Sequence, residues 1–336
     1  MLHTAWFIVL VTLVAGYAVL DGFDLGVGAL HLLLPRGDAE RTVAIETIGP
    51  VWNGNEVWLV AAGGAMFAAF PLLYASAFSG FYLPLMLVLW LLVFRGLGIE
   101  FRHQVDHLMW RQAWDVAFTL ASALLAFILG VAFANVLRGV PLDDGGRFEG
   151  TFGLVLNPFS LTGGALGLLT LAMHGSAWLA FKTTGELRVR AQRTTDRLWA
   201  SVVFVLLSMT TGSFRVRPNF IANFERWPVL LALPLVTLAA LVTIRWTRGT
   251  SRDGLRFAAT SAFIVGVLAS AAAGLYPRLL PTPDGARFLG LDIYNAAAPD
   301  ASLRTALWLY GLGLALVSAY LVRSYRTWSG RVSGTH

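Results

Sequence analysis

The stretch GYAVLDGFDLGVGAL, residues 16–30, decides the fold because it continues an apolar, membrane-type run and yet carries two carboxylates. Asp21 and Asp24 are three residues apart, so a helix places both on one face. Gly22 and Gly26 have the spacing at which small residues let a second helix approach closely. Carboxylates are costly inside a bilayer. These two therefore either lie at the interface, where the span has ended, or have a function.

The composition is that of an integral membrane protein. Of the 336 residues, 57% are hydrophobic and only 13% are charged, whereas soluble domains carry about 25% charged residues. The chain has no cysteine, which excludes disulfides, thiolate metal sites and iron–sulfur clusters. Its net charge of +6 comes from basic residues between apolar runs. We therefore expect a lipid membrane, and no nucleic acid, as its environment.

Apolar runs of about 20 residues, the length that spans a bilayer, recur along the whole chain. They lie at roughly 5–30, 52–75, 78–97, 114–136, 157–181, 197–213, 228–246, 256–276 and 303–323. We predict an all-α integral membrane protein of about nine transmembrane helices, with residues 1–336 forming a single polytopic domain and no soluble domain. Few residues separate the second and third runs, so we expect a tight hairpin around 74–79.

The distribution of basic residues predicts the orientation. The 25 Lys and Arg residues fall mostly in the odd-numbered loops and the C-terminal segment. The positive-inside rule then places the N-terminus outside and the C-terminus in the cytoplasm. No basic segment precedes the first run, so we expect an uncleaved helix and not a signal peptide.

A second polar stretch, ETIGPVWNGNEVW at residues 46–58, stands at the start of the second run. Helix initiation and capping can explain Pro50 and Asn53, and Trp52 can be an interface anchor. Glu56 is harder to explain in this way because it lies inside the apolar run. An ionisable group there is a functional candidate by default.

A third polar stretch, FRGLGIEFRH at residues 94–103, ends the third run. The planar fork of Arg95 can bind a carboxylate, or the propionate of a cofactor on a neighbouring protein. Alternatively, its side chain can snorkel to the cytoplasmic edge. Glu100 and Arg102 follow at the same edge. The sequence leaves these alternatives open.

His174 is the only histidine well inside an apolar run. It could ligate a haem, but one histidine supplies one axial position and no second intramembrane histidine is present. A hydrogen-bonded packing residue is the better interpretation. His103 and His107 have a spacing seen in some zinc sites, but Arg102 beside them argues against metal. We expect no metal site.

Together these stretches resemble subunit II of the bacterial cytochrome bd quinol oxidases. The resemblance covers nearly the whole chain and is most specific in the first hundred residues. It is carried by GYAVLDGFDLGVG at 16–28, IGPVWNGNEVWL at 48–59, FAAFPLLYASAFSGFYLP at 67–84 and FRGLGIEFR at 94–102.

The resemblance implies a heterodimer in the bacterial cytoplasmic (inner) membrane that oxidises quinol and reduces dioxygen to water. Subunit I, similar in architecture, would hold two b-type haems and one d-type haem. Subunit II would bind none and would not be catalytic alone. Some members carry a structural quinone in subunit II, and small accessory single-helix subunits can attach. The length of the chain resembles the shorter members, sometimes classed as cyanide-insensitive.

The resemblance also implies roles for single residues. The family often has Asp, proposed to belong to a proton path, where this chain has Asn53. Because Asn53 cannot ionise, Glu56, about one helical turn on and close to Trp52, could take over that role. Arg95 matches an arginine near subunit I and a haem propionate, and Glu100 and Arg102 lie on the same side. Structural hydrogen bonds are expected for Asp21, Asp24 and His174, and helix packing for Gly22 and Gly26.

Two other functions remain open from the sequence. Buried acids in about nine helices fit a secondary transporter loosely, although no internal repeat or pair of broken helices is evident. A purely structural scaffold would differ from the oxidase reading only in whether Glu56 and Asn53 move protons.

Overall fold

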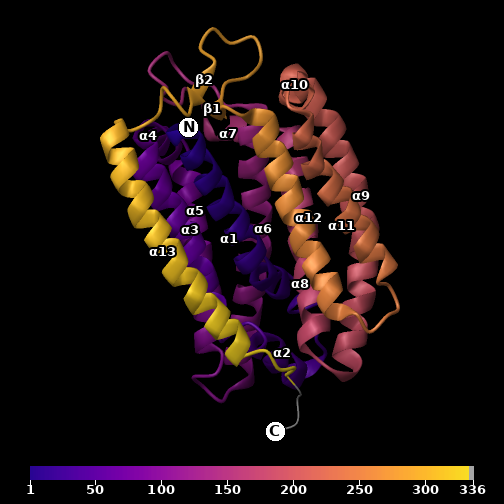
Figure 1. Ribbon diagram of the computed structural model, residues 1–336. Helices are drawn as coiled ribbons and strands as arrows, with labels where there is room; N and C mark the ends of the chain where they lie inside the picture. The colour runs from indigo at the N-terminus through magenta and orange to yellow at the C-terminus, as the bar shows by residue number, and fades with distance from the viewer. Residues whose placement is uncertain (333–336) are drawn as a thin grey trace.

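The computed structural model describes residues 1–332 and forms an elongated bundle of helices (Figure 1). The helices are α1 (Leu2–Leu30), α2 (Gly37–Glu46), α3 (Trp52–Ala69), α4 (Pro71–Gly80), α5 (Tyr82–Phe101), α6 (Leu108–Arg138), α7 (Phe152–Val155), α8 (Pro158–Lys182), α9 (Gly185–Val216), α10 (Ala222–Arg226), α11 (Ala232–Trp246), α12 (Asp253–Leu275) and α13 (Asp300–Thr327). Strands β1 (Arg278–Pro281) and β2 (Gly290–Asp292) form an antiparallel pair in the loop before α13.

The predicted all-α membrane fold is confirmed. Eight helical segments within residues 1–332 are long and apolar enough to cross a membrane: α1, α5, α6, α8, α9, Pro228–Trp246, α12 and α13. Helix α3 is 18 residues long but opens with a polar turn. Helix α1 starts at one end of the bundle and α13 finishes at the other (Figure 1), as an odd number of crossings requires. The number of spans and their orientation stay predictions.

The predicted second run and the hairpin after it were wrong in detail. Helix α3 ends at Ala69, and Phe70 has a non-helical backbone, with φ −134° and ψ 66°. Pro71 then starts α4, a ten-residue helix at the upper end of the bundle, before α5 begins (Figure 1). The break follows from Pro71, which lacks an N–H and disfavours a helical conformation for the residue before it.

Helix α1 lies in the middle of the bundle and packs very closely on α8. A Cβ atom added to Gly26 would lie 1.9 Å from the carbonyl oxygen of Leu171, and one on Gly175 would lie 2.3 Å from the carbonyl carbon of Gly26. At Gly22 an added Cβ would meet side chains and no backbone atom, with Leu171 at 2.9 Å and His174 at 3.8 Å. Gly26 is therefore the glycine that the backbone approach requires.

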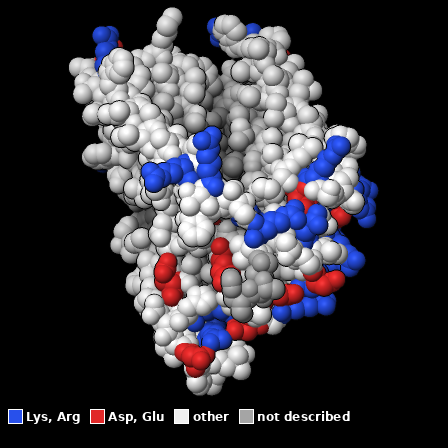
Figure 2. Space-filling model, turned by 60° about the horizontal axis from the view of Figure 1, so that its bottom comes forward, with Lys and Arg blue, Asp and Glu red and all other residues white. Residues whose placement is uncertain are grey.

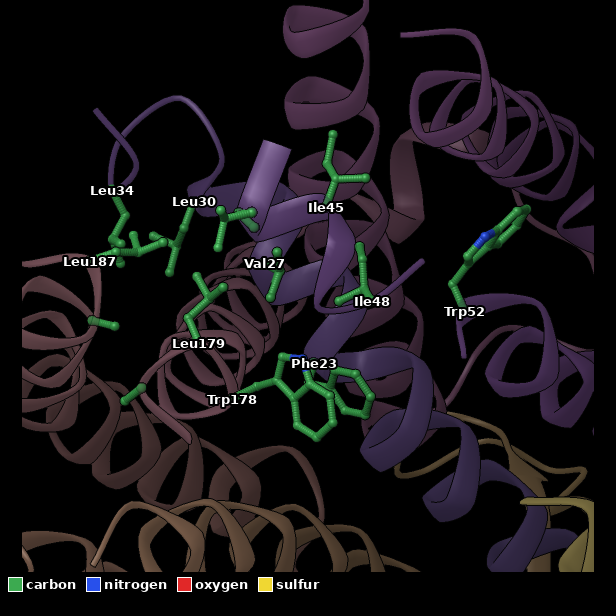
Figure 3. Close-up of a cluster of buried hydrophobic side chains, with 14 of the residues drawn as sticks. Phe23, Val27, Leu30, Leu34, Ile45, Ile48, Trp52, Trp178, Leu179 and Leu187 are labelled. Atoms are coloured by element: carbon green, nitrogen blue, oxygen red, sulfur yellow. The ribbon is translucent and has the colours of Figure 1, made fainter. Parts of the chain in front are cut away.

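Below this crossing, aromatic and aliphatic side chains of α1, α2 and α8 form a hydrophobic core (Figure 3). Phe23 stacks on Trp178 with 4.1 Å between ring centroids. Beyond this core lies the end of the bundle that carries α2. Figure 2 shows basic and acidic side chains gathered at this end.

Candidate functional site

A buried polar cluster lies where α1, α3, α5 and α13 meet, and it is the candidate functional site. Helix α1 contributes Asp21 and Asp24, both fully buried. Helix α3 contributes Asn55 and α5 contributes Arg95, which are also buried. Tyr325 reaches the cluster from α13. All these groups sit on helices that are otherwise apolar, so the polar side chains have to satisfy one another.

Arg95 and Asp21 form a bidentate ion pair. Nη1 of Arg95 donates to Oδ2 of Asp21 at 2.7 Å, and Nη2 donates to Oδ1 at 2.5 Å. The Arg95 side chain is 1% exposed. Of the alternatives that the sequence leaves open for Arg95, these contacts fit pairing with a carboxylate, and the burial does not fit snorkelling.

Asp24 has no such cation. Its Oδ2 accepts a hydrogen bond from Nδ2 of Asn55 at 2.8 Å, and the Tyr325 hydroxyl donates to Oδ1 of Asn55 at 2.9 Å. Oδ1 of Asp24 is buried and has no hydrogen-bond partner among the described residues. The three residues thus form a chain from α13 through α3 to α1.

The predicted site residues of α3 do not all face the cluster. Glu56 is half-buried and lies within electrostatic reach of Arg95 and Asp21. Trp52 is buried against α5, where an added Cβ on Gly96 would lie 3.3 Å from its ring. Asn53, in contrast, is exposed.

Neither Asn55 nor Tyr325 was predicted from the sequence as a site residue. Asn55 could have been found from its helical spacing, because it shares the buried face of α3 with Trp52 and Ala62. No comparable signal marks Tyr325, whose role depends on α13 folding back beside α3.

Arg102 belongs to a second network inside the chain. Its Nε donates to Oδ1 of Asp115 at 2.7 Å, and its Nη2 donates to Oδ1 of Asp38 at 2.5 Å. Asp115 is also contacted by Arg41 and by Nε2 of His31, at 3.2 and 2.7 Å. The Arg102 side chain is therefore bound within its own chain. Glu100, which was predicted to lie with Arg102 on the side facing subunit I, is exposed.

His31, just beyond the end of α1, is enclosed by this network. Burial lowers the pKa of His31, although the hydrogen bond to Asp115 acts in the opposite direction. The neutral imidazole can donate from Nε2 to the Asp115 carboxylate. Neither His31 nor Asp115 was predicted from the sequence as a site residue, because their contact joins segments far apart in the chain.

His174 uses both ring nitrogens for helix packing. Nδ1 is hydrogen-bonded to the Thr260 hydroxyl at 2.7 Å, and Nε2 donates to the Val19 carbonyl oxygen at 3.0 Å. The ring stacks on Phe257. With both nitrogens engaged, His174 joins α1, α8 and α12 and is not placed to ligate a haem. Within residues 1–332, no three His, Cys, Asp or Glu side chains are grouped so that they could hold a metal ion.

Comparisons with known proteins agree with this architecture. The sequence model for cytochrome bd terminal oxidase subunit II matches residues 2–328. This chain belongs to that family. It is 31% identical to cytochrome bd-I ubiquinol oxidase subunit 2 of Escherichia coli K12, over 99% of this chain and 95% of the relative. It is 33% identical to cytochrome bd ubiquinol oxidase subunit 2 of Bacillus subtilis, over 99% and 97%.

The fold is similar to a solved structure of bd oxidase from Geobacillus thermodenitrificans, with a TM-score of 0.73. The match covers 96% of this chain and 97% of that chain at 18% identity. The chain is therefore a subunit of an inner-membrane quinol oxidase complex, an oxidoreductase, and the haems are carried by its partner, subunit I. The alternative of a secondary transporter was wrong.

Proposed function

We propose that Glu56 begins a proton route from the cytoplasmic side into the oxidase, in addition to the support that the chain gives to subunit I. The observation that carries this proposal is the position of Glu56. It is half-buried, about one turn into α3, and within electrostatic reach of Arg95 and Asp21. Glu56 thus lies in the part of α3 that is nearer the charged end of the bundle, beside the buried carboxylates. A carboxyl group in that place can exchange protons with both sides.

The direction of the route rests on the predicted orientation. Charged side chains gather at the end that carries α2 (Figure 2), and α3 starts beside it. By the positive-inside rule this end faces the cytoplasm. Protons would therefore enter near Trp52 and Glu56, whereas the exposed amide of Asn53 cannot hold a proton for transfer.

We further propose that subunit I covers the face of α3 and α5 that presents Asn53 and Glu100. Both side chains are exposed on helices that are otherwise apolar, and a protein partner can satisfy polar groups that lipid cannot. Arg95 lies behind this face. Because Asp21 occupies both of its terminal nitrogens, a haem propionate of subunit I would have to share the guanidinium.

The chain also has a cavity that fits a structural quinone. About 820 Å³ in volume, it lies between α1, α6, α8, α9, α11 and α12. Its walls are nearly all apolar, with Leu129, Phe133, Leu166 and Phe263 among them, as an isoprenoid tail requires. Thr170 is one of the lining residues, and its buried hydroxyl has no hydrogen-bond partner among the described residues. Quinol as the substrate and a small accessory subunit stay predictions of the resemblance.

The decisive experiment is turnover of a Glu56→Gln complex purified with subunit I. We expect normal haem content and oxygen consumption lowered by about tenfold or more, as loss of a proton-transfer group usually causes. Glu186→Gln is the matched control, because Glu186 is an exposed acid in the first turn of α9. Wild-type oxygen consumption in Glu56→Gln would reject the route and leave the scaffold role alone.

A further inference from the structure

The buried cluster has more acids than cations. Asp24 is faced by Asp21 of its own helix, by Glu56 of α3, by Arg95 of α5 and by the Tyr325 hydroxyl of α13. Together with Asp24 these are five groups, of which three are carboxyls and one, Arg95, is a cation. Both terminal nitrogens of Arg95 are directed at Asp21, so one negative charge is compensated.

A second ionised carboxylate in this place would be costly. Removing a carboxylate from water costs several kcal/mol unless a cation and hydrogen bonds replace the solvent. Asp24 is fully buried and accepts a single hydrogen bond, from the neutral amide of Asn55. Its other oxygen has no partner among the described residues. These contacts fit a neutral carboxylic acid better than an anion.

Tyr325 sets the direction of that single hydrogen bond. Its hydroxyl donates to Oδ1 of Asn55, so the amide NH₂ group is the part of Asn55 that points at Asp24. The Asn55 amide can stabilise Asp24 during the time in which Asp24 is ionised. Because the amide is neutral, it does not keep Asp24 permanently ionised as a cation would. Asn55 and Tyr325 are therefore positioning residues for Asp24.

We propose that Asp24 rests in its protonated form and is a second proton-holding residue on the route that Glu56 begins. This inference rests on the proposed function of Glu56. In each cycle the Asp24 proton leaves toward subunit I, and one proton from Glu56 replaces it. One proton enters and one leaves, so the cluster returns to the same charge.

The first test compares Asp24→Asn with Asp21→Asn in the complex with subunit I. Asparagine resembles a neutral aspartic acid, so Asp24→Asn should keep the wild-type haem content and thermal stability while turnover falls by about tenfold or more. Asp21→Asn should lose the haem-loaded complex, because it leaves Arg95 buried without a counter-charge. If Asp24→Asn loses the complex as Asp21→Asn does, or if it turns over normally, the inference is overturned.

The two proposals can fail separately. Normal turnover of Asp24→Asn with impaired Glu56→Gln would reject the inference and keep the proposed function. The reverse result would reject Glu56 as the entry residue and keep Asp24 as a proton-holding group with another donor.

The second test is infrared spectroscopy of the complex, measured as the reduced-minus-oxidised difference. The wild type should show the C=O stretch of a protonated carboxyl group that is absent in Asp24→Asn. Tyr325→Phe should shift this band because Asn55 loses its orientation, and a purely structural tyrosine would not move it. Tyr320→Phe on the same helix is the control, since Tyr320 is exposed. A wild-type spectrum without a band that depends on Asp24 would overturn the inference.

Discussion

Arg95 of α5 holds Asp21 of α1 through two parallel N–H···O hydrogen bonds, at 2.7 and 2.5 Å, in a place that water does not reach. The pair fastens α5 to α1, the central helix of the bundle. Because both partners are buried, removing either one leaves an uncompensated charge, whereas removing both does not.

This asymmetry gives the first prediction. Arg95→Gln alone should cost about 3–5 kcal/mol and strongly lower the yield of haem-loaded complex. The double variant Asp21→Asn/Arg95→Gln should recover much of that yield if Asp21 is the only partner of Arg95. The haem absorbance of purified complexes measures both.

The same double variant separates the two roles considered for Arg95. If the guanidinium also binds a haem propionate of subunit I, the double variant will assemble with altered haem absorbance or reduced haem content. Full recovery of yield and spectrum would show that the arginine acts within this chain alone.

The fold could largely be predicted from the sequence, because apolar runs of spanning length leave a helix bundle as the main solution. The error at α3 and α4 came from reading 52–75 as one run. Pro71 interrupts that run without changing its hydropathy. Hydropathy predicts which segments can lie in lipid. Breaks in a helix have to be predicted separately, from the positions of proline residues.

The site could be predicted only in part. Asp21, Glu56 and Arg95 are conspicuous because charged residues stand out in apolar helices. Which group pairs with each charge depends on the tertiary structure. The partners Arg95 and Asp21 are separated by 74 positions in the sequence, and Tyr325 and Asn55 by 270. Asn53 was favoured over Asn55 by its resemblance to a family position, although the buried face of α3 includes Asn55.

Gly26 offers a packing prediction. Gly26→Ala would put a methyl group 1.9 Å from the Leu171 carbonyl oxygen, so α1 and α8 would have to separate. Overpacking of this kind costs about 1–3 kcal/mol or more, and we expect a clear loss of thermal stability of the complex. Gly311→Ala on α13 is the control, because an added Cβ there meets nothing within 4 Å. Equal stability of the two variants would contradict the close approach.

His31 makes the stability of the chain depend on pH. Burial lowers the pKa of His31 in the folded protein, so near and below about pH 6.5, the usual histidine value, the unfolded chain binds the additional proton. Folding stability should therefore fall as the pH decreases through this range. His31→Gln should flatten that part of the profile, measured as thermal unfolding of the complex from about pH 8 to about pH 5. An unchanged slope would show that His31 titrates alike in both states.

The exchange of an acid between two neighbouring positions tests the proton route most directly. The resembled family often has Asp where this chain has Asn53, and this chain has Glu56 instead. If one carboxyl group in the first turns of α3 is sufficient, Asn53→Asp should restore oxygen consumption to a Glu56→Gln complex, in part or in full. The comparison needs equal haem content in the single and double variants.

A matched control separates rescue by an acid from rescue by a neutral polar side chain. Asn53→Glu introduces the same charge with a longer side chain and should also restore turnover, whereas Asn53→Ser should not. In the isolated chain Asn53 is exposed, so rescue also requires that subunit I enclose this face, as proposed. Failure of both acids in a complex with full haem content would show that the route passes through Glu56 only, or that α3 carries no protons.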